Sequence, residues 1–229
     1  MDKILRVKNL NVELGGEKVI ENLSFDVAET ETWVILGPNG AGKTVLLKAL
    51  LGLIPYEGEI EWKKGIKIGY VPQGLLPVKD VPINVREFFK LKNIPDKDIK
   101  DILISIGLEE KMLEKNIGYL SSGQFQRILV GWGLAGNPQV LLFDEPTTGI
   151  DIGGEETIYN LLEKLRQERK LTIMMVSHDL NIVYKFAAKV LCLSRRILCL
   201  GAPKEVLTGE MLAQLYGGEI KFYQHGDHE

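Results

Sequence analysis

The sequence predicts an α/β fold with a parallel β-sheet core, an antiparallel β part at the N-terminal end and an inserted helical subdomain. Three apolar runs, Trp33 to Leu36, Val140 to Phe143 and Ile173 to Val176, lack polar alternation, which indicates parallel strands covered on both faces. From Leu10 to Val27 apolar and polar residues alternate around a glycine pair, which predicts an antiparallel hairpin. Between Gln73 and Gly136 strand signals vanish, and prolines separate short helical segments, which predicts the helical insertion.

Three amphipathic segments are expected to cover the sheet: Thr44 to Ile54, Gln124 to Ala135 and Glu155 to Glu168. After Pro203 we expect two short helices, followed by a polar tail from Gln224. We interpret the chain as one domain in which residues 1–73 and 137–202 form the α/β core with its antiparallel part, 74–136 the helical subdomain, and 203–229 the C-terminal helices and tail.

The composition is that of a globular protein: 229 residues, 45% hydrophobic and 26% charged. Lys and Arg number 28 against 31 Asp and Glu, a net charge of -3, so no overall basic field favours a nucleic-acid partner. No apolar run approaches the roughly 20 residues that span a bilayer, and the first residues are charged, which favours a cytoplasmic location. Cys192 and Cys199 match neither a zinc motif nor CxxC, and we expect two buried free thiols.

A phosphate-binding loop follows the first apolar run and opens a helix. Its eight residues match the pattern GxxxxGK[ST]: Gly37, Pro38, Asn39, Gly40, Ala41, Gly42, Lys43 and Thr44. Glycines let backbone N–H groups approach phosphate oxygens, the lysine reaches the β- and γ-phosphates, and the threonine hydroxyl suits Mg²⁺. The chain is therefore expected to bind ATP and Mg²⁺.

Two carboxylates, Asp144 and Glu145, end the apolar run that begins at Val140. Asp144 is expected to hold Mg²⁺ through water, and Glu145 to act as the base that polarises the attacking water. Acids at a strand end are often merely solvated, but the phosphate loop upstream favours the catalytic interpretation.

Four further segments complete a family pattern. Leu120-Ser121-Ser122-Gly123-Gln124 precedes an apolar helical face, Gln73 ends Tyr70-Val71-Pro72-Gln73, Asp151 follows the two acids, and His178 stands in Val176-Ser177-His178-Asp179. With these residues the chain resembles the ATP-binding cassette (ABC) ATPases over nearly its whole length. Without that resemblance, Ser121 or Ser122 would be read as a helix N-cap only.

The resemblance implies a head-to-tail homodimer enclosing two ATP molecules, in which Ser121, Gly123 and Gln124 of one chain meet the nucleotide held by the other. Ser122 replaces the first glycine of the family's LSGGQ, which a helical backbone would tolerate. Gln73 would sense Mg²⁺ and the membrane partner, Asp151 would touch the opposite chain, and His178 would contact the γ-phosphate.

An aromatic ring that usually stacks on adenine in this family is missing here. No aromatic residue precedes Phe25, and Leu14 stands at the matching place in the first hairpin. Base binding by stacking is therefore in question.

A membrane permease is the expected partner, because two other classes of the family fit poorly. Lys43 and Ser121 are 78 residues apart, too close for the coiled coil of chromosome-maintenance relatives, and translation-type relatives carry two cassettes in one chain, where this chain has one. Segments around Trp62, Gln73 and Cys192 are similar to the ATPase subunits of zinc-type metal importers, which implies a metal-binding solute receptor as an indirect partner. A siderophore or other solute importer, or a non-transport ABC ATPase, stays an alternative. His225 and His228 suit zinc chemically, although a solvated tail explains them as well.

Apolar residues after Gln73 either line a groove for the permease or form the core of the helical subdomain. These are Leu75, Leu76, Val78, Ile83, Phe88 and Phe89.

Overall fold

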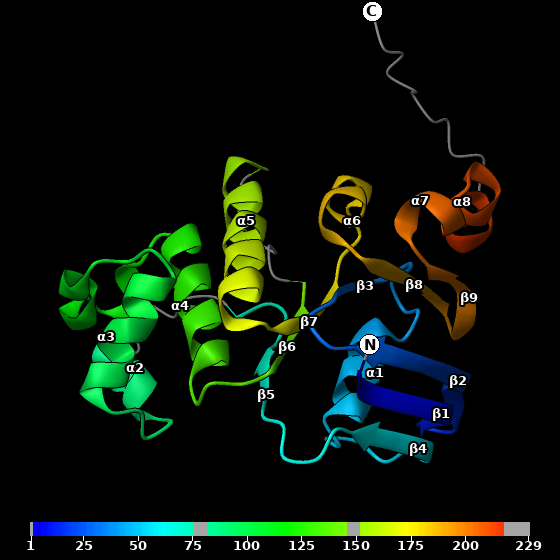
Figure 1. Ribbon diagram of the computed structural model, residues 1–229, viewed down its shortest axis with the longest axis horizontal. Coiled ribbons are helices and arrows are strands. Elements are labelled where there is room, and N and C mark those ends of the chain that lie inside the picture. The colour runs from blue at the N-terminus through cyan, green and yellow to red at the C-terminus, as the bar shows by residue number, and fades with distance from the viewer. Residues whose placement is uncertain (1, 76–81, 146–151, 218–229) are drawn as a thin grey trace, which may run out of the picture.

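Two β-sheets organise the computed structural model, which describes residues 2–75, 82–145 and 152–217 (Figure 1). The smaller sheet is antiparallel, has the strand order β2-β1-β4, and consists of β1 Lys3–Leu14, β2 Glu17–Ala28 and β4 Glu57–Trp62. Its first two strands are the predicted hairpin, joined at Gly15 and Gly16, which both have positive φ. The alternation of the sequence is reproduced in the burial of Leu10, Val12 and Ile20.

The larger sheet has six strands in the order β5-β6-β7-β3-β8-β9. Its strands are β3 Thr32–Leu36, β5 Ile68–Val71, β6 Val140–Asp144, β7 Thr172–Val176, β8 Lys189–Ser194 and β9 Arg196–Gly201. The three predicted parallel strands are confirmed as β3, β6 and β7, and β5 and β8 also pair in parallel. Only the β8–β9 pair is antiparallel among these strand pairs, because β9 returns through a short turn.

Successive residues of the central strands enter opposite cores, which explains why these strands are apolar throughout. Trp33 and Ile35 pack toward helix α1 (Lys43–Leu50) and the antiparallel sheet, whereas Val34 and Leu36 pack toward the other side. That side is covered by α5 (Ile152–Arg169) and α6 (Leu180–Phe186), above the sheet in Figure 1.

A helical region follows β5 and packs beside the large sheet (Figure 1). It contains α2 (Val85–Lys90), α3 (Asp96–Ser105), 3₁₀ turns at Glu110–Glu114 and Ile117–Tyr119, and α4 (Ser122–Leu134). Pro95 precedes the first residue of α3, and Gly107, with φ of 69°, follows its end, as the breakers of the sequence predict. The boundaries 74–136 that we assign to the helical subdomain stay a prediction.

Two short helices, α7 (Pro203–Val206) and α8 (Gly209–Tyr216), end the described chain. Pro203 occupies the first turn of α7, and the Thr208 side chain accepts a hydrogen bond from Met211 N at the start of α8. The polar tail from Gln224, with His225 and His228, lies outside the described residues.

The prediction of free thiols is wrong. Cys192 on β8 and Cys199 on β9 are directly opposite in the antiparallel ladder, with Cα atoms 4.8 Å apart, and they form a disulfide. The two cysteines face each other because of the strand register, which includes a shift between Cys192 and Leu193, and a search for zinc and CxxC spacings does not test that register.

The predicted fold class is confirmed, with one antiparallel edge strand added to the parallel sheet. Across residues 2–75, 82–145 and 152–217, no helix is both long enough and apolar enough to span a membrane.

Candidate functional site

The phosphate loop joins β3 to α1 and is shaped by three glycines. Gly40 and Gly42 have φ of 78° and 95°, left-handed conformations that favour glycine. A Cβ atom on Gly37 would lie 2.2 Å from the carbonyl oxygen of Leu193, so only glycine fits against β8 at this point. The loop thus directs the amino end of α1, with its unpaired N–H groups, toward a bound anion.

Lys43 is the first residue of α1, and its side chain folds back over the loop. Its Nζ donates hydrogen bonds to the carbonyl oxygens of Gly37 at 2.8 Å and Pro38 at 2.9 Å. Burial lowers the pKa of Lys43, while the nearby carboxylates of Glu145 and Asp144 oppose that shift. The two hydrogen bonds hold the ammonium group at the loop. Phosphate oxygens of a nucleotide could replace the two carbonyl oxygens as its hydrogen-bond acceptors.

Thr44 and Asp144 meet at the carboxyl edge of the sheet although 100 residues separate them. The Thr44 hydroxyl donates to Asp144 Oδ1 at 3.1 Å, and Asp144 is 2% exposed. Burial raises the pKa of Asp144, the Thr44 hydrogen bond partly offsets that shift, and the charge of Glu145 adds to it. A hydroxyl and a carboxylate side by side are hard oxygen donors, so the pair fits Mg²⁺.

Gln73 and Glu145 form the second pair of the site. Gln73 Nε2 donates to Glu145 Oε2 at 2.5 Å, and the two residues come from the ends of the neighbouring strands β5 and β6. Glu145 has φ of 52°, an uncommon conformation for a residue other than glycine. The backbone conformation of Glu145 and its hydrogen bond with Gln73 together set the position of its carboxylate.

These residues surround one cleft of about 480 Å³, lined by Val19, Asn39, Gly40, Ala41, Gly42, Lys43, Thr44, Val45, Gln73 and Glu145. Val19 was missed at the sequence level, where only an aromatic ring was sought for the base. It lies on β2, and its Cγ1 is 3.3 Å from where a Cβ of Gly42 would stand. Two features of the sequence could have indicated Val19: it lies two residues after the start of β2, and it belongs to the apolar pattern of the hairpin.

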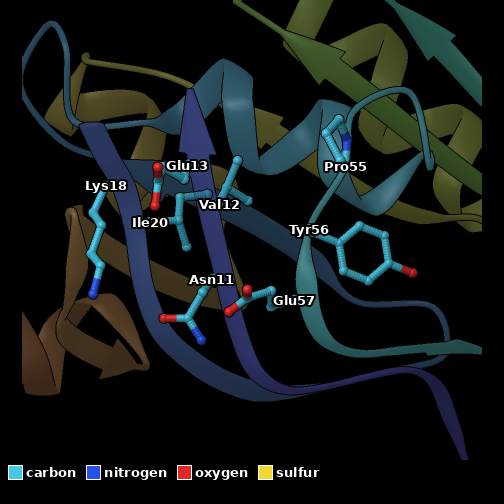
Figure 2. Close-up of a pocket in the computed structure, with 8 residues that line it drawn as sticks. All are labelled: Asn11, Val12, Glu13, Lys18, Ile20, Pro55, Tyr56 and Glu57. Carbon is cyan, nitrogen blue, oxygen red and sulfur yellow. The ribbon is translucent and has the colours of Figure 1, made fainter. Parts of the chain in front are cut away.

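Leu14 is outside this cleft. It is the last residue of β1, paired with Glu17 beside the turn, and is 40% exposed. Tyr56 offers no substitute ring, because it lines a separate cleft of about 440 Å³ between β1, β2 and residues 55–57, and in Figure 2 its ring points away from the hairpin. The predicted contact of Leu14 with adenine stays a prediction.

The segment 121–124 begins α4 and lies apart from the cleft. Ser121 is exposed and caps the helix, accepting from Gln124 N while Gln124 Oε1 accepts from Ser121 N, at 3.2 Å each. Ser122 is helical, as its replacement of glycine requires, and a Cβ on Gly123 would meet no atom within 4 Å. In the described part of the chain, no residue of α4 lines the phosphate cleft.

His178 follows β7 and is exposed, between Ser177 and the N-cap of α6, Asp179. It does not line the phosphate cleft in this chain. Asp151 lies outside the described residues. The roles assigned to both residues stay predictions.

Apolar residues of the expected groove divide between surface and core. Phe89 is fully buried, and Phe88 packs on Trp132 with ring centroids 4.4 Å apart, so both belong to the core of the helical region. Leu75 is 45% exposed and Ile83 is half-buried. Leu76 and Val78 lie outside the described residues.

Asp144→Asn is expected to raise the melting temperature by a few degrees at pH 7 while hydrolysis falls. The raised pKa means that the folded state is penalised once Asp144 ionises: the penalty is absent well below pH 3.8, the ordinary pKa, and complete above the raised value. Thermal scans from pH 4 to 8 check this, with Asp101→Asn, an exposed residue of α3, as the surface comparison. An Asp144→Asn melting temperature below wild type at every pH contradicts the expectation.

Comparisons with known proteins agree with this geometry. A family profile described as ABC transporter matches residues 20–148. The "Zinc import ATP-binding protein ZnuC" of Photorhabdus laumondii is 36% identical over 98% of this chain and 90% of its own, and that of Buchnera aphidicola is 36% identical over 100% and 98%.

Comparison with solved structures agrees with these sequence matches. A chain from a transporter assigned to the metal-chelate ABC type, in an inward-facing conformation, has a TM-score of 0.84 at 28% identity, covering 95% of this chain and 90% of its own. The cbiO1 protein of Clostridium perfringens, part of the ABC transporter complex cbiONQ, has a TM-score of 0.79 at 27% identity, covering 93% and 94%. The phosphate loop, the strand-end carboxylates and these matches together make the chain a member of the ABC transporter family and an ATP-binding ATPase.

Proposed function

We propose that this chain is the ATP-binding subunit of an importer that takes up a divalent metal ion, zinc in the first place, through a membrane permease. The observation that carries the proposal is the 36% identity, over 98% of this chain, with a zinc import ATP-binding protein. The chain would sit at the cytoplasmic face of the cell membrane, bound to the permease, with a metal-binding solute receptor as an indirect partner. Its own described residues contain no group of three or more His, Cys, Asp or Glu placed to hold a metal, which fits a subunit that powers transport.

The polar groups at the cleft divide the tasks of hydrolysis among them. The loop N–H groups and Lys43 bind the β- and γ-phosphates, and Thr44 and Asp144 would hold Mg²⁺. When bound, Mg²⁺ supplies positive charge that neutralises the phosphate oxygens. Glu145 accepts a proton from the attacking water, and the Gln73 amide orients the Glu145 carboxylate through their 2.5 Å hydrogen bond.

The complete site requires a second copy of the chain in head-to-tail arrangement. Ser121 is exposed at the amino end of α4, and the space beside Gly123 is open. Ser121, Gly123, Gln124 and Asp151 of one copy would close the cleft of the other over ATP, and His178 would reach the γ-phosphate. Polar motifs dominate this surface, so association depends on the nucleotide.

The decisive experiment reconstitutes the ATPase with its permease in liposomes and measures ATP turnover with receptor protein loaded with zinc, manganese or iron. We expect stimulation by a metal-loaded receptor, strongest with zinc. The matched control uses metal-free receptor, and a chain truncated after Gln224 should behave as the full chain does. Stimulation by a siderophore, sugar or peptide receptor, with none by any metal-loaded receptor, overturns the metal assignment and leaves the ATPase intact.

Leu14→Tyr is expected to tighten ATP binding about 2- to 10-fold, because a stacked ring contributes roughly 0.5 to 1.5 kcal/mol beyond area burial. Calorimetric titration with ATP and GTP measures the gain and the base preference. Val19→Ala is the companion variant: if Val19, and not Leu14, contacts the base, this change weakens binding while Leu14→Tyr leaves the affinity unchanged. That combined result contradicts the placement of adenine beside Leu14.

A further inference from the structure

The turn between β8 and β9 contacts the phosphate loop and β2. Arg195, at the tip of the turn, donates its N–H to the Ala41 carbonyl oxygen at 3.3 Å and accepts from Glu21 N at 2.9 Å. The Arg196 guanidinium pairs with the Glu21 carboxylate. One residue before the turn, the Leu193 carbonyl oxygen stands where a Cβ of Gly37 would clash. The turn and the end of β8 therefore contact the loop at Ala41 and Gly37 and connect it to β2, the strand that carries Val19.

The Cys192–Cys199 disulfide is the covalent link at the base of this turn. Cys192 is the parallel partner of Leu36, the last residue before the phosphate loop. The ladder is irregular between Cys192 and Leu193, so regular strand pairing does not continue unbroken into the turn. The disulfide therefore joins β8 to β9 directly beside this irregularity.

We infer that the Cys192–Cys199 disulfide is a redox latch on the phosphate loop, and that its reduction by a dithiol weakens ATP binding. At the proposed cytoplasmic location the surroundings are reducing, and a disulfide in a reducing compartment is usually redox-active rather than only structural. Cys192 is fully buried and Cys199 is 8% exposed, so Cys199 is the more accessible of the two residues. The latch rests on the cytoplasmic location proposed above, and it does not depend on which solute is carried.

The exchange needs a dithiol as the reductant. One thiolate of the dithiol attacks Cys199 Sγ, the bond to Cys192 Sγ breaks, and Cys192 leaves as a thiolate that takes up a proton. The second thiol of the dithiol then attacks the mixed disulfide, becomes oxidised with the first, and releases Cys199 as a thiol. Two electrons and two protons pass from the dithiol to the protein, and the loop loses its covalent support.

The experiment compares oxidised wild-type protein, protein reduced with dithiothreitol, and the Cys192→Ala/Cys199→Ala double variant, each with and without reductant. Alkylation of the denatured protein followed by mass spectrometry counts free thiols in each sample. Reduction is expected to weaken ATP binding about five-fold or more and to lower the melting temperature by about 5 to 10 °C. The double variant should match the reduced protein and ignore the reductant.

Three results would overturn the latch. Free thiols throughout the oxidised sample would show that the disulfide does not form. Equal ATP affinity in the oxidised and reduced proteins, with lower stability after reduction, would leave a bond that is structural only. A fall in affinity that also occurs when the double variant meets reductant would place the effect elsewhere. Absence of ATP binding in the oxidised wild-type protein would instead contradict the ATPase assignment, which makes that failure distinguishable from these three results.

Discussion

Glu145→Gln should bind ATP at near wild-type affinity and hydrolyse it about 10² to 10⁴ times more slowly, the usual cost of losing a general base. The amide cannot accept the proton of the attacking water. Its oxygen can still accept the hydrogen bond that Gln73 Nε2 now donates to Glu145, so the cleft keeps its shape. With hydrolysis blocked, ATP should hold two chains together as a dimer.

Phosphate release measures the rate, and analytical ultracentrifugation with ATP and Mg²⁺ measures the dimer. Glu61→Gln, an exposed glutamate on β4, is the matched control and should hydrolyse ATP as wild type does. Wild-type turnover in Glu145→Gln would remove Glu145 as the base. A slow variant that stays monomeric with ATP would remove the enclosed dimer.

An equal mixture of Lys43→Ala and Gly123→Arg should hydrolyse ATP although neither variant does so alone. Lys43→Ala removes the charge that binds the phosphates, and loss of one such group costs about 10² to 10³ in rate. Gly123→Arg fills space that is open in the chain itself, so its effect falls on the partner. In a head-to-tail dimer, a mixed pair carries both defects in one site and leaves the other intact.

Random pairing makes about half of the dimers mixed, each with one intact site, so the mixture should reach about one quarter of the wild-type rate. Each variant at the same total concentration is the control for the mixture. Gly123→Ala and Gly123→Arg should melt within a degree or two of wild type, which separates an interface effect from unfolding. A mixture no faster than its components contradicts the shared site.

The sequence alone predicted the fold class and much of the cleft, because both depend on local patterns. Apolar runs that end at Leu36 and Phe143 indicate strands covered on both faces, and strands of a parallel sheet bring their carboxyl ends to one edge. A phosphate loop after one such run and two acids after another therefore had to converge. The structure confirms the strands and brings Lys43, Thr44, Gln73 and Glu145 to one cleft beside Asp144, while their catalytic roles stay predictions.

Only the tertiary structure decided the features that depend on strand register and on contacts between distant segments. The disulfide exists because β8 and β9 place Cys192 opposite Cys199, and no zinc or CxxC spacing reports that pairing. Val19 lines the cleft because β2 packs against Gly42, a contact between the antiparallel sheet and the phosphate loop. Ser121 was recognised from its motif, yet its separation from the cleft of its own chain follows from where α4 packs. Local patterns determine which elements form; packing determines which of their side chains meet.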